Sequence, residues 1–330
     1  SCALIAGKLR DYGYNSRSWL GWQLPIITKG NHSSSRIIKI KKNKILSYLK
    51  KGGIPIITGF QGVNHDFRIT TLERGGSDTS AILCAKFFSA EKCIIYTDVK
   101  GIYTTDPNLI KNAKKINKIS YEEMLEMASL GAKVMQPASI QEARLNRIEI
   151  DVRSTFSKIA GTRITKKKNI LSKNTIRGIS FTKNDAKLSL IGVKDKPGIA
   201  ASIFKPLYEN SINVDMVVQN VSAGGKETDL TFTVKLEDLR KTRKLVENNK
   251  QIKFKKLIIN KNVSKVSIVG VGMVTTPGIT YRMFKALAKK KINIKVISTS
   301  EIKISVLIDK KNLKKSVAIL HQEFKLNNSL

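Results

Sequence analysis

The sequence predicts an α/β protein in which a mainly parallel sheet, sandwiched by helices, is followed by two smaller βαββαβ units. Short apolar runs alternate with helical patterns in the first half, as in sheets whose parallel strands are joined by helices. Two copies of a strand–turn–helix–strand pattern then begin at Lys187 and Lys265. A length of 330 residues allows two or three domains with sizeable cores.

The first half supplies its elements in alternating order. Small and apolar residues at helical spacing predict a helix over 1–12. No capping residue precedes it, so we expect the chain to begin inside a helix, with an N-terminal part missing. Periodicity and apolar runs predict the elements that follow: a strand over 54–62, a helix over 78–90, a strand over 92–98, a helix over 120–135 and a strand over 148–154.

The helix over 120–135 carries its own start signal. Ser120 precedes the helical pattern and Glu123 follows three residues later, the spacing of a capping box in which each side chain bonds the other residue's backbone N–H. Beyond the last strand of this half the chain becomes rich in Lys, Ser, Thr and Asn. We therefore expect a catalytic or binding domain over 1–160 and a linker over 161–174.

The two repeats predict ferredoxin-like units. Each runs from an apolar strand through Pro-Gly-Ile and an amphipathic helix to a second strand, then an alternating strand and another helix. The second copy lacks its last strand, and an orphan strand at 175–183 precedes the first copy. We expect the orphan strand to complete the second sheet. The first unit, 184–262, would then be inserted within the second, which comprises 175–183 and 263–330.

The formal net charge of +35 has two interpretations. A strongly basic chain is attracted to nucleic-acid backbones. Here, however, the lysines are spread along the chain, no nucleic-acid motif accompanies them and aromatic residues make up only 6%. We favour a lysine-rich composition at solvated positions and expect no nucleic-acid partner.

The apolar content and the cysteines bear on the compartment. No stretch approaches the roughly 20 apolar residues that a membrane helix needs, so no membrane partner is expected. Cys2, Cys84 and Cys93 are odd in number and lack CxxC spacing. We interpret them as reduced and mostly buried, which indicates a cytoplasmic protein.

A polar cluster at the start of a helix is the first candidate site. Thr70–Leu83 reads TTLERGGSDTSAIL, and a Gly-Gly turn there would present backbone N–H groups at the positive end of the helix. Arg74 can grip a carboxylate or phosphate with two donors. Such parts suit an anionic substrate and phosphoryl transfer. Alone, the cluster is better explained as a capped helix after a glycine turn, since short glycine motifs recur by chance.

A second motif follows the strand over 92–98. IIYTDVKGIYTTDPN (94–108) combines two aspartates, a glycine turn and a proline, and loops at the carboxyl ends of parallel strands are where such sheets bind ligands. By itself it could be a long turn. A third element, GAKVMQP (131–137), contains Lys133, which alone could be a solvated lysine.

Together these motifs resemble the aspartate kinase family. TTLERGGSDTSA, YTDVKGIYTTDP and GAKVMQPAS occur in the family's order and are followed by two repeats that look like ACT domains. SRSWLGWQLPI (16–26) and ITGFQG (57–62) match as well, so the resemblance covers essentially the whole chain. It implies an amino-acid kinase fold and transfer of the ATP γ-phosphoryl group to the side chain of L-aspartate. This reaction is the first step toward lysine, threonine and methionine.

The resemblance also implies residue roles. Asp78 would be catalytic by organising charge at the phosphates. The residues expected to bind aspartate are Phe60, Thr71, Arg74, Gly75, Gly76 and Ser77. Those expected to bind ATP, which comes with Mg²⁺, are Thr97, Asp98, Tyr103, Thr104, Thr105, Asp106, Pro107 and Lys133. No other metal is expected.

The repeats predict an effector site. In KDKPGIAAS (194–202) a turn feeds a helix whose free N–H groups suit an amino-acid carboxylate. In 211–220, polar residues that suit an ammonium group alternate with Val214, Met216 and Val218, which we expect to face the helix-covered core; a plain solvent-facing surface is the alternative. Lysine and/or threonine is the expected effector, with pairing of ACT units into a homodimer or higher homo-oligomer. The expected residues are Asp195, Pro197, Gly198, Ile199, Ala200, Asn213, Asp215, Gln219, Asn293, Ser300 and Glu301.

Two departures from the family keep a second function open. Glu73 stands where the family usually has glycine, and it could pair with Arg74 and weaken substrate binding. The family's Lys-Phe-Gly-Gly phosphate loop and a substrate-binding Gly-Glu pair have no match in this sequence, and we expect them N-terminal to Ser1. The alternative is a catalytically inactive amino-acid sensor that retains the kinase fold.

Overall fold

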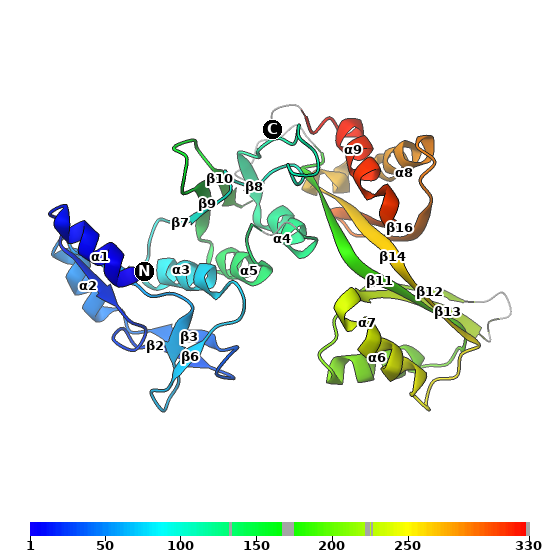
Figure 1. Ribbon diagram of the computed structural model, residues 1–330, viewed down its shortest axis with the longest axis horizontal. Coiled ribbons are helices and arrows are strands. Elements are labelled where there is room, and N and C mark those ends of the chain that lie inside the picture. The colour runs from blue at the N-terminus through cyan, green and yellow to red at the C-terminus, as the bar shows by residue number, and fades with distance from the viewer. Residues whose placement is uncertain (132–133, 167–174, 222–224, 226, 328–330) are drawn as a thin grey trace. The chain divides into compact units, whose positions relative to one another are not determined.

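The computed structural model of the chain describes residues 1–131, 134–166, 175–221, 225 and 227–327 (Figure 1). Two compact units divide it. Unit 1 comprises Ser1–Ile102, Lys115–Ser129 and Lys133–Ser172, and unit 2 comprises Tyr103–Lys114, Leu130–Ala132 and Lys173–Leu330. The segment 103–114 therefore belongs to unit 2, although the domain predicted over 1–160 contains it.

Unit 1 alternates helices with short strands. Its elements are α1 (Cys2–Asp11), β1 (Ser16–Trp19), β2 (Ile26–Lys29), β3 (Arg36–Ile40), α2 (Asn43–Lys50), β4 (Ile54–Ile57), β5 (Gln61–Val63), β6 (Ile69–Thr71), α3 (Gly76–Phe87), β7 (Lys92–Thr97), β8 (Lys118–Ser120), α4 (Tyr121–Ser129), α5 (Pro137–Asn146), β9 (Glu149–Ser154) and β10 (Thr162–Thr165).

The strands of unit 1 form sheets that combine parallel and antiparallel pairs. β1 pairs with β4 in parallel. A second sheet has the order β7-β9-β10-β8, in which β7 runs parallel to β9 and β10 runs parallel to β8. A third has the order β3-β2-β5-β6, whose outer pairs are antiparallel. The parallel pairs thus join strands that are separated by helices along the chain, and the antiparallel pairs join consecutive strands.

Two local outcomes concern predicted elements of unit 1. The capping box is confirmed: Glu123 N–H donates to Ser120 Oγ over 3.1 Å, and Ser120 N–H donates to Glu123 Oε2 over 3.1 Å. The segment predicted as a linker, 161–174, contains the strand β10. This strand pairs with both β8 and β9, and its Ile164 is fully buried. Residues 167–174 lie outside the described residues.

Unit 2 contains the two repeats. Its elements are β11 (Gly178–Lys194), α6 (Ile199–Glu209), β12 (Val214–Val221), β13 (Glu227–Lys235), α7 (Leu239–Glu247), β14 (Lys256–Val269), α8 (Ile279–Lys289), β15 (Ile294–Thr299), β16 (Lys303–Asp309) and α9 (Leu313–Glu323), with short 3₁₀ turns at Leu236–Asp238, Val271–Thr275 and Lys310–Asn312. The strands form one six-stranded sheet with the order β12-β13-β11-β14-β16-β15.

Both repeats share the two central strands of this sheet, β11 and β14 (Figure 1). Gly178–Thr182 of β11 pair with Lys265–Val269 of β14, beside β16. Lys187–Ile191 of β11 pair with Lys256–Asn260 of β14, beside β13. The sequence predicts an orphan strand and a separate first strand, whereas the structure joins them into one strand, with register shifts around Asp185.

Each half of unit 2 has its own core. Leu188, Leu190, Phe232 and other apolar residues pack with α6 and α7 in the first half. Val266, Ile268, Val306 and their neighbours pack with α8 and α9 in the second. These helix-covered clusters account for the amphipathic helices of both repeats.

A third, smaller cluster corrects the predicted alternation along β12. Val214 packs against the helix-covered core of the first half, but Met216 lies in a separate cluster with Val263, Val296 and Leu307. A register shift between Val214 and Val217 explains the change, because an irregularity of this kind interrupts the two-residue period of a strand. The apolar residues of β12 therefore do not all face the helix-covered core.

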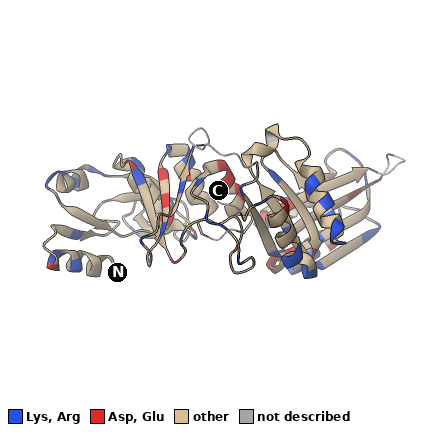
Figure 2. Cartoon of the chain, turned by 90° about the horizontal axis from the view of Figure 1, so that it is seen from above, with Lys and Arg blue, Asp and Glu red and all other residues tan. Residues whose placement is uncertain are grey.

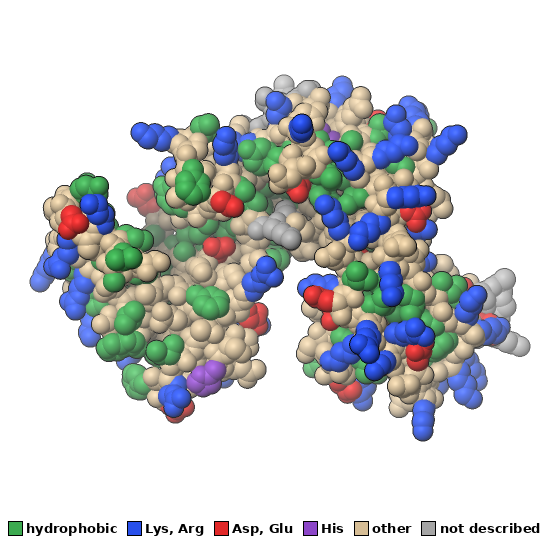
Figure 3. All heavy atoms as spheres, in the orientation of Figure 1, with side chains coloured by type: hydrophobic (Ala, Val, Ile, Leu, Met, Phe, Trp, Pro, Cys, Tyr) green, Lys and Arg blue, Asp and Glu red, His purple; other side chains and the backbone are tan. Residues whose placement is uncertain are grey.

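Charged side chains are spread over the molecule. Lys and Arg lie on helices, strands and loops in both units (Figure 2). On the face shown in Figure 3, basic side chains are interspersed with apolar and uncharged ones. Among the described residues, no helix is long and apolar enough to cross a membrane.

Candidate functional site

The glycine cluster forms a tight turn directly before α3. The strand β6 ends at Thr71, and Gly75 adopts a left-handed conformation with φ of 81° as the residue that precedes the helix. This conformation favours glycine, because it has no Cβ. No side chain caps α3 in the structure. The helix therefore opens with backbone N–H groups that lack a side-chain acceptor, which is a favourable place for an anion.

The surroundings of Gly76 leave no space for a side chain. A Cβ there would lie 2.5 Å from Leu72 Cβ and 2.9 Å from the ring of Phe60. Phe60 itself has φ of 66°, is 41% exposed and donates its N–H to Ser80 Oγ over 3.0 Å. Ser80 in turn donates to the carbonyl of Gly76. The structure thus brings the predicted substrate residues Phe60, Gly75 and Gly76 together at one helix start.

Charged groups of this cluster differ in exposure. Arg74 and Glu73 are both exposed, and neither forms an ion pair with any residue that the structure describes. The pairing of Glu73 with Arg74 that would weaken substrate binding is therefore not seen. Asp78 lies in the first turn of α3, and burial raises the pKa of its carboxyl group. Burial and, to a smaller extent, the charge of Asp78 raise the pKa of the Cys93 thiol to about 11, so Asp78 and the strand β7 are neighbours.

The remaining predicted substrate residues lie at the two sides of the turn. Thr71 donates its backbone N–H to the carbonyl of His32 over 2.7 Å, and its hydroxyl donates to the same carbonyl over 3.3 Å. Ser77 is exposed in the first turn of α3. Its hydroxyl is therefore accessible to a ligand at the helix start.

Two supporting residues were missed by the sequence analysis. Ser80 fixes Phe60, as described above. Gln136 packs so closely on Gly75 that a Cβ at Gly75 would overlap with its side chain. Both lie inside motifs quoted from the sequence, TTLERGGSDTSA and GAKVMQPAS, so membership of a motif was the available signal. Their contacts depend on the fold and could not be derived from spacing.

The predicted nucleotide residues fall into two groups. Thr97 ends β7, and its hydroxyl donates to Asp98 Oδ1 over 3.0 Å. Both belong to unit 1, whereas Tyr103, Thr104, Thr105, Asp106 and Pro107 belong to unit 2. Lys133 lies outside the described residues.

The residues of the second group differ in accessibility. Asp106 and Pro107 are exposed and Tyr103 is half-buried. Thr104 is fully buried, and its hydroxyl is engaged by His321 and by the backbone N–H of Lys114. Thr104 therefore stabilises the fold of unit 2 instead of offering a side chain to a ligand. Thr105 is 4% exposed, and its hydroxyl has no partner among the described residues.

The predicted effector residues of the first repeat are partly gathered. Asp195, Pro197, Gly198, Ile199, Ala200 and Gln219, together with Lys196, line a cavity of about 390 Å³. Gly198 has φ of 87° and precedes α6, which has no side-chain cap. The cavity therefore places the uncapped start of a helix opposite a side chain of β12.

The other effector residues lie elsewhere. Asn213 lines a second cavity of about 500 Å³ beside α6, with Phe204, Tyr208 and Val217 among its neighbours. Asp215 pairs with the ammonium group of Lys265, whose side chain is only 5% exposed. This carboxylate thus neutralises a buried lysine.

In the second repeat, Asn293 precedes β15, while Ser300 and Glu301 form the turn between β15 and β16. All three are exposed.

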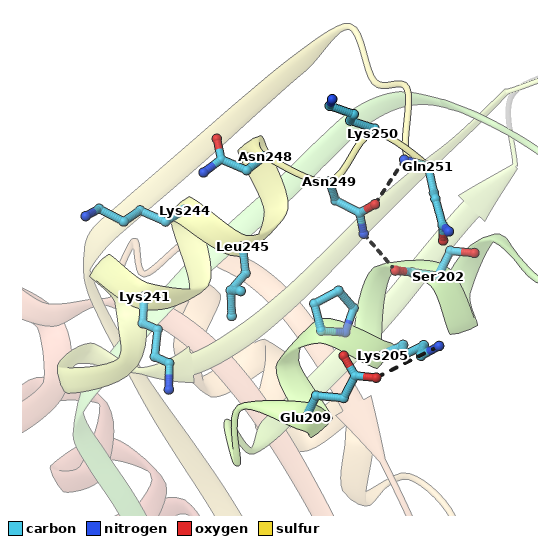
Figure 4. Close-up of a pocket in the computed structure, with 11 residues that line it drawn as sticks. Ser202, Lys205, Glu209, Lys241, Lys244, Leu245, Asn248, Asn249, Lys250 and Gln251 are labelled. Carbon is cyan, nitrogen blue, oxygen red and sulfur yellow. Dashed lines mark hydrogen bonds and ion pairs between the residues drawn. The ribbon is translucent and has the colours of Figure 1, made fainter.

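A further cavity, of about 560 Å³, was not predicted (Figure 4). It lies between α6 and α7, with Lys205 and Glu209 from α6 and Lys241 and Lys244 from α7 around it. Glu209 partly offsets the positive charge of these lysines, because its Oε1 lies 3.9 Å from Nζ of Lys205. Because lysines are spread throughout the chain, their presence here does not identify a ligand.

Comparisons with known proteins agree with this arrangement. Residues 1–154 match the amino acid kinase family, and residues 188–249 and 266–324 match the ACT domain. An aspartate kinase of Pseudomonas fluorescens is 43% identical over 327 residues, which is 98% of this chain and 79% of the relative. Aspartokinase 2 of Bacillus subtilis is 40% identical, with the same shares covered.

Solved structures show the same similarity. Aspartokinase III of E. coli in complex with aspartate and ADP superposes with a TM-score of 0.80 at 25% identity, covering 98% of this chain and 72% of that one. The aspartate kinase of Clostridium acetobutylicum gives 0.82 at 25% identity, covering 93% and 70%. With a glycine turn at a helix start, two ACT repeats and relatives at 40–43% identity over almost its full length, this chain belongs to the aspartate kinase family.

Proposed function

We propose that this chain transfers the γ-phosphoryl group of ATP to the side-chain carboxylate of L-aspartate. A carboxylate oxygen would attack the γ-phosphorus, the bond to the β–γ bridging oxygen would break, and ADP and 4-phospho-L-aspartate would result. The observation that carries the proposal is the uncapped glycine turn before α3, with the exposed Arg74 beside it, which forms no ion pair within the described part of the chain. It supplies the fixed donors on which positioning of an anionic substrate depends.

The substrate roles follow from this geometry. Arg74 would pair with the α-carboxylate of aspartate through two parallel hydrogen bonds. The Ser77 hydroxyl and backbone N–H groups at the start of α3 would donate hydrogen bonds to the remaining negatively charged oxygens of the substrate. Phe60 and Gly76 would shape the pocket, since Phe60 is fixed by Ser80 and no side chain fits at Gly76. Asp78, beside them and partly buried, would organise charge at the phosphates.

ATP would enter with Mg²⁺, its usual companion in phosphoryl transfer. Mg²⁺ keeps most of its waters and needs only one or two protein carboxylates besides the phosphates. Exposed Asp98 at the end of β7 and Asp106 in the second motif are of the right type. Thr97, Tyr103 and Pro107 would contact the nucleotide. The E. coli relative was solved with ADP and aspartate, which supports nucleotide use here.

The regulatory region would bind lysine and/or threonine at the cavity beside Asp195. An amino-acid carboxylate would lie at the uncapped start of α6, and Asp195 would face the ammonium group. E. coli aspartokinase III was also solved with lysine, which supports an amino-acid effector. We assign 1–160 to catalysis and 175–330 to regulation, with the addition that 103–114 packs with the regulatory unit.

A second copy of the chain would pair with the first repeat. β12 is an edge strand of the sheet; its Val217 is 48% exposed, and Tyr208 on the neighbouring α6 is 82% exposed. An apolar cavity next to an open edge suits β-sheet continuation between two chains.

The three free thiols, with burial raising the pKa of Cys84 to about 12, suit a reducing compartment. We therefore place the protein in the cytoplasm.

Arg74→Ala tests the proposed substrate site. In the full-length protein the variant should lose about 2–5 kcal/mol of transition-state stabilisation, seen as a lower kcat/KM for aspartate. The reason is that it removes one partner of a charge pair that becomes buried when substrate binds. Steady-state kinetics with aspartate varied at saturating ATP measures this loss. Arg68→Ala, another exposed arginine in the loop before β6, is the matched control and should change little. Equal kcat/KM values for the Arg74 variant and the control would remove Arg74 from the site.

A further inference from the structure

The loop Tyr103–Lys114 carries more than half of the proposed nucleotide residues but belongs to the same compact unit as the regulatory repeats. We call it the anchored loop. Its Ile110 is 8% exposed and belongs to the core that α8 and α9 cover, and Leu109 packs against the same core. The apolar side of the loop therefore contributes to the folding of the second repeat.

Backbone hydrogen bonds close the anchored loop and attach it to β11. Thr104 N–H donates to the carbonyl of Lys114 over 2.8 Å, which joins the two ends of the loop. The carbonyl of Thr104 accepts the N–H of Ile179, on β11, over 2.7 Å. At the tip, Asp106 accepts the N–H of Asn108 over 2.8 Å. Thr104 is thus the residue at which loop closure and attachment coincide.

A buried side-chain pair fixes the same residue. Thr104 Oγ1 lies 2.9 Å from Nε2 of His321, on α9, and the two residues are 0% and 2% exposed. Because Thr104 Oγ1 already accepts the N–H of Lys114 over 3.0 Å, its own proton is available to Nε2. Burial lowers the pKa of His321, which favours the neutral ring, and a neutral ring that carries its proton on Nδ1 accepts this hydrogen bond at Nε2.

We propose that His321 is a positioning residue for the nucleotide, which acts by fixing Thr104 and thereby the anchored loop. The proposal rests on the nucleotide assignment of Tyr103, Asp106 and Pro107 given above. Apolar packing of Leu109 and Ile110 keeps the loop on the unit, but a hydrogen bond is directional and fixes which atoms face outward. The second repeat would therefore determine how the loop presents its exposed residues to ATP.

Substitutions at position 321 separate positioning from packing. His321→Leu keeps a side chain of comparable volume but cannot accept the proton, whereas His321→Gln retains a polar atom near the place of Nε2. Ser316→Ala is the control, because Ser316 is also fully buried on α9 and, among the residues that the structure describes, its hydroxyl bonds the carbonyl of Asn312 alone. Thr104→Val removes the same bond from the loop side, should a change at 321 prevent folding.

Kinetics and hydrogen exchange of the full-length protein provide two readouts. We expect His321→Leu to raise KM for ATP about tenfold, with KM for aspartate unchanged, and to accelerate amide exchange in the peptide covering 103–114. His321→Gln should recover most of both values, and Ser316→Ala should match the unsubstituted protein. Tyr103→Ala, measured in parallel, reports whether the loop contacts the nucleotide at all.

The outcomes distinguish this inference from the assignment beneath it. Unchanged exchange and unchanged KM for ATP in folded His321→Leu, alongside a raised KM in Tyr103→Ala, would overturn the positioning role alone. A parallel rise of both KM values would also overturn it, because it indicates general loosening. If Tyr103→Ala leaves KM for ATP unchanged, the nucleotide assignment is wrong and the positioning role falls with it. Faster loop exchange in that case would show that the anchor is structural only.

Discussion

Single residues with little freedom define the candidate site. Gly75 is held in the left-handed region against Gln136, and Gly76 is enclosed by Leu72 and Phe60. The sequence could show that two glycines precede a helix, because such turns have a recognisable composition. It could not show which glycine is required by conformation and which by space. That distinction depends on neighbours from distant segments.

Gly76→Ala should weaken aspartate binding by forcing the pocket wall outward. The new methyl group would lie 2.5 Å from Leu72 Cβ, and Leu72 is 4% exposed and cannot readily move. Overpacking of this kind costs about 1–3 kcal/mol. Gly7→Ala is the control, since an added Cβ meets nothing within 4 Å there.

Urea unfolding followed by tryptophan fluorescence would measure the loss of stability, because Trp19 and Trp22 are both in unit 1. KM for aspartate would measure the effect on the site. Wild-type stability together with wild-type KM in Gly76→Ala would contradict the crowded geometry.

At the scale of elements, the prediction of a helix or strand succeeded where its own residues carry a clear hydrophobic pattern. α1, α3, β7 and β9 were predicted near their observed bounds, because each has a clear period or a continuous apolar run. The strand predicted over 54–62 is divided into β4 and β5, and the short strands β2, β3 and β6 were not predicted, since three to five residues carry too little pattern. β10 was not predicted because it lies in a polar segment, and it forms a strand by pairing with β8 and β9.

The start of α4 offers a test of a locally encoded element. Ser120→Ala removes the hydroxyl that accepts the N–H of Glu123, so the free energy of unfolding of unit 1 should fall by about 1 kcal/mol. Ser129→Ala, at the exposed end of the same helix, should have a smaller effect. Tryptophan-monitored urea unfolding of both variants provides the comparison. A loss at Ser129 equal to that at Ser120 would show that the cap is not a special contribution.

For the molecule as a whole, the sequence predicted two kinds of unit but not which segments of the chain belong to each. Repeats and motif order are visible in one dimension. The continuity of β11 past Asp185, the pairing of Asp215 with Lys265 and the docking of 103–114 into the second repeat are contacts between distant segments. Only the folded chain shows them. Two of them also changed the expected roles of Asp215 and Thr104.

Effector binding should be visible as a stabilisation of the whole protein. Lysine or threonine at 100 times its dissociation constant would add about 2.7 kcal/mol to the free energy of unfolding, since it binds only the folded state. A thermal shift titration with each common amino acid measures the rise in Tm. Gln219→Ala should diminish it, because Gln219 lines the cavity beside Asp195. Gln251→Ala, in the cavity between α6 and α7, should leave it unchanged. A folded protein whose Tm responds to neither amino acid would contradict the effector assignment.

The two strands shared by both repeats have a consequence for how the regulatory region comes into being. Gly178 pairs with Val269, about ninety residues further along the chain, so this part of the central ladder cannot close until the whole of the first repeat has been synthesised. The first repeat can complete its sheet within 184–262, because Lys187–Ile191 and Lys256–Asn260 both lie there, whereas the second repeat also needs Gly178–Thr182, which precede the first repeat. The second repeat should therefore assemble late, and a ribosome-bound chain that ends before β14, in which neither repeat has all its strands, should remain a target for chaperones and proteases.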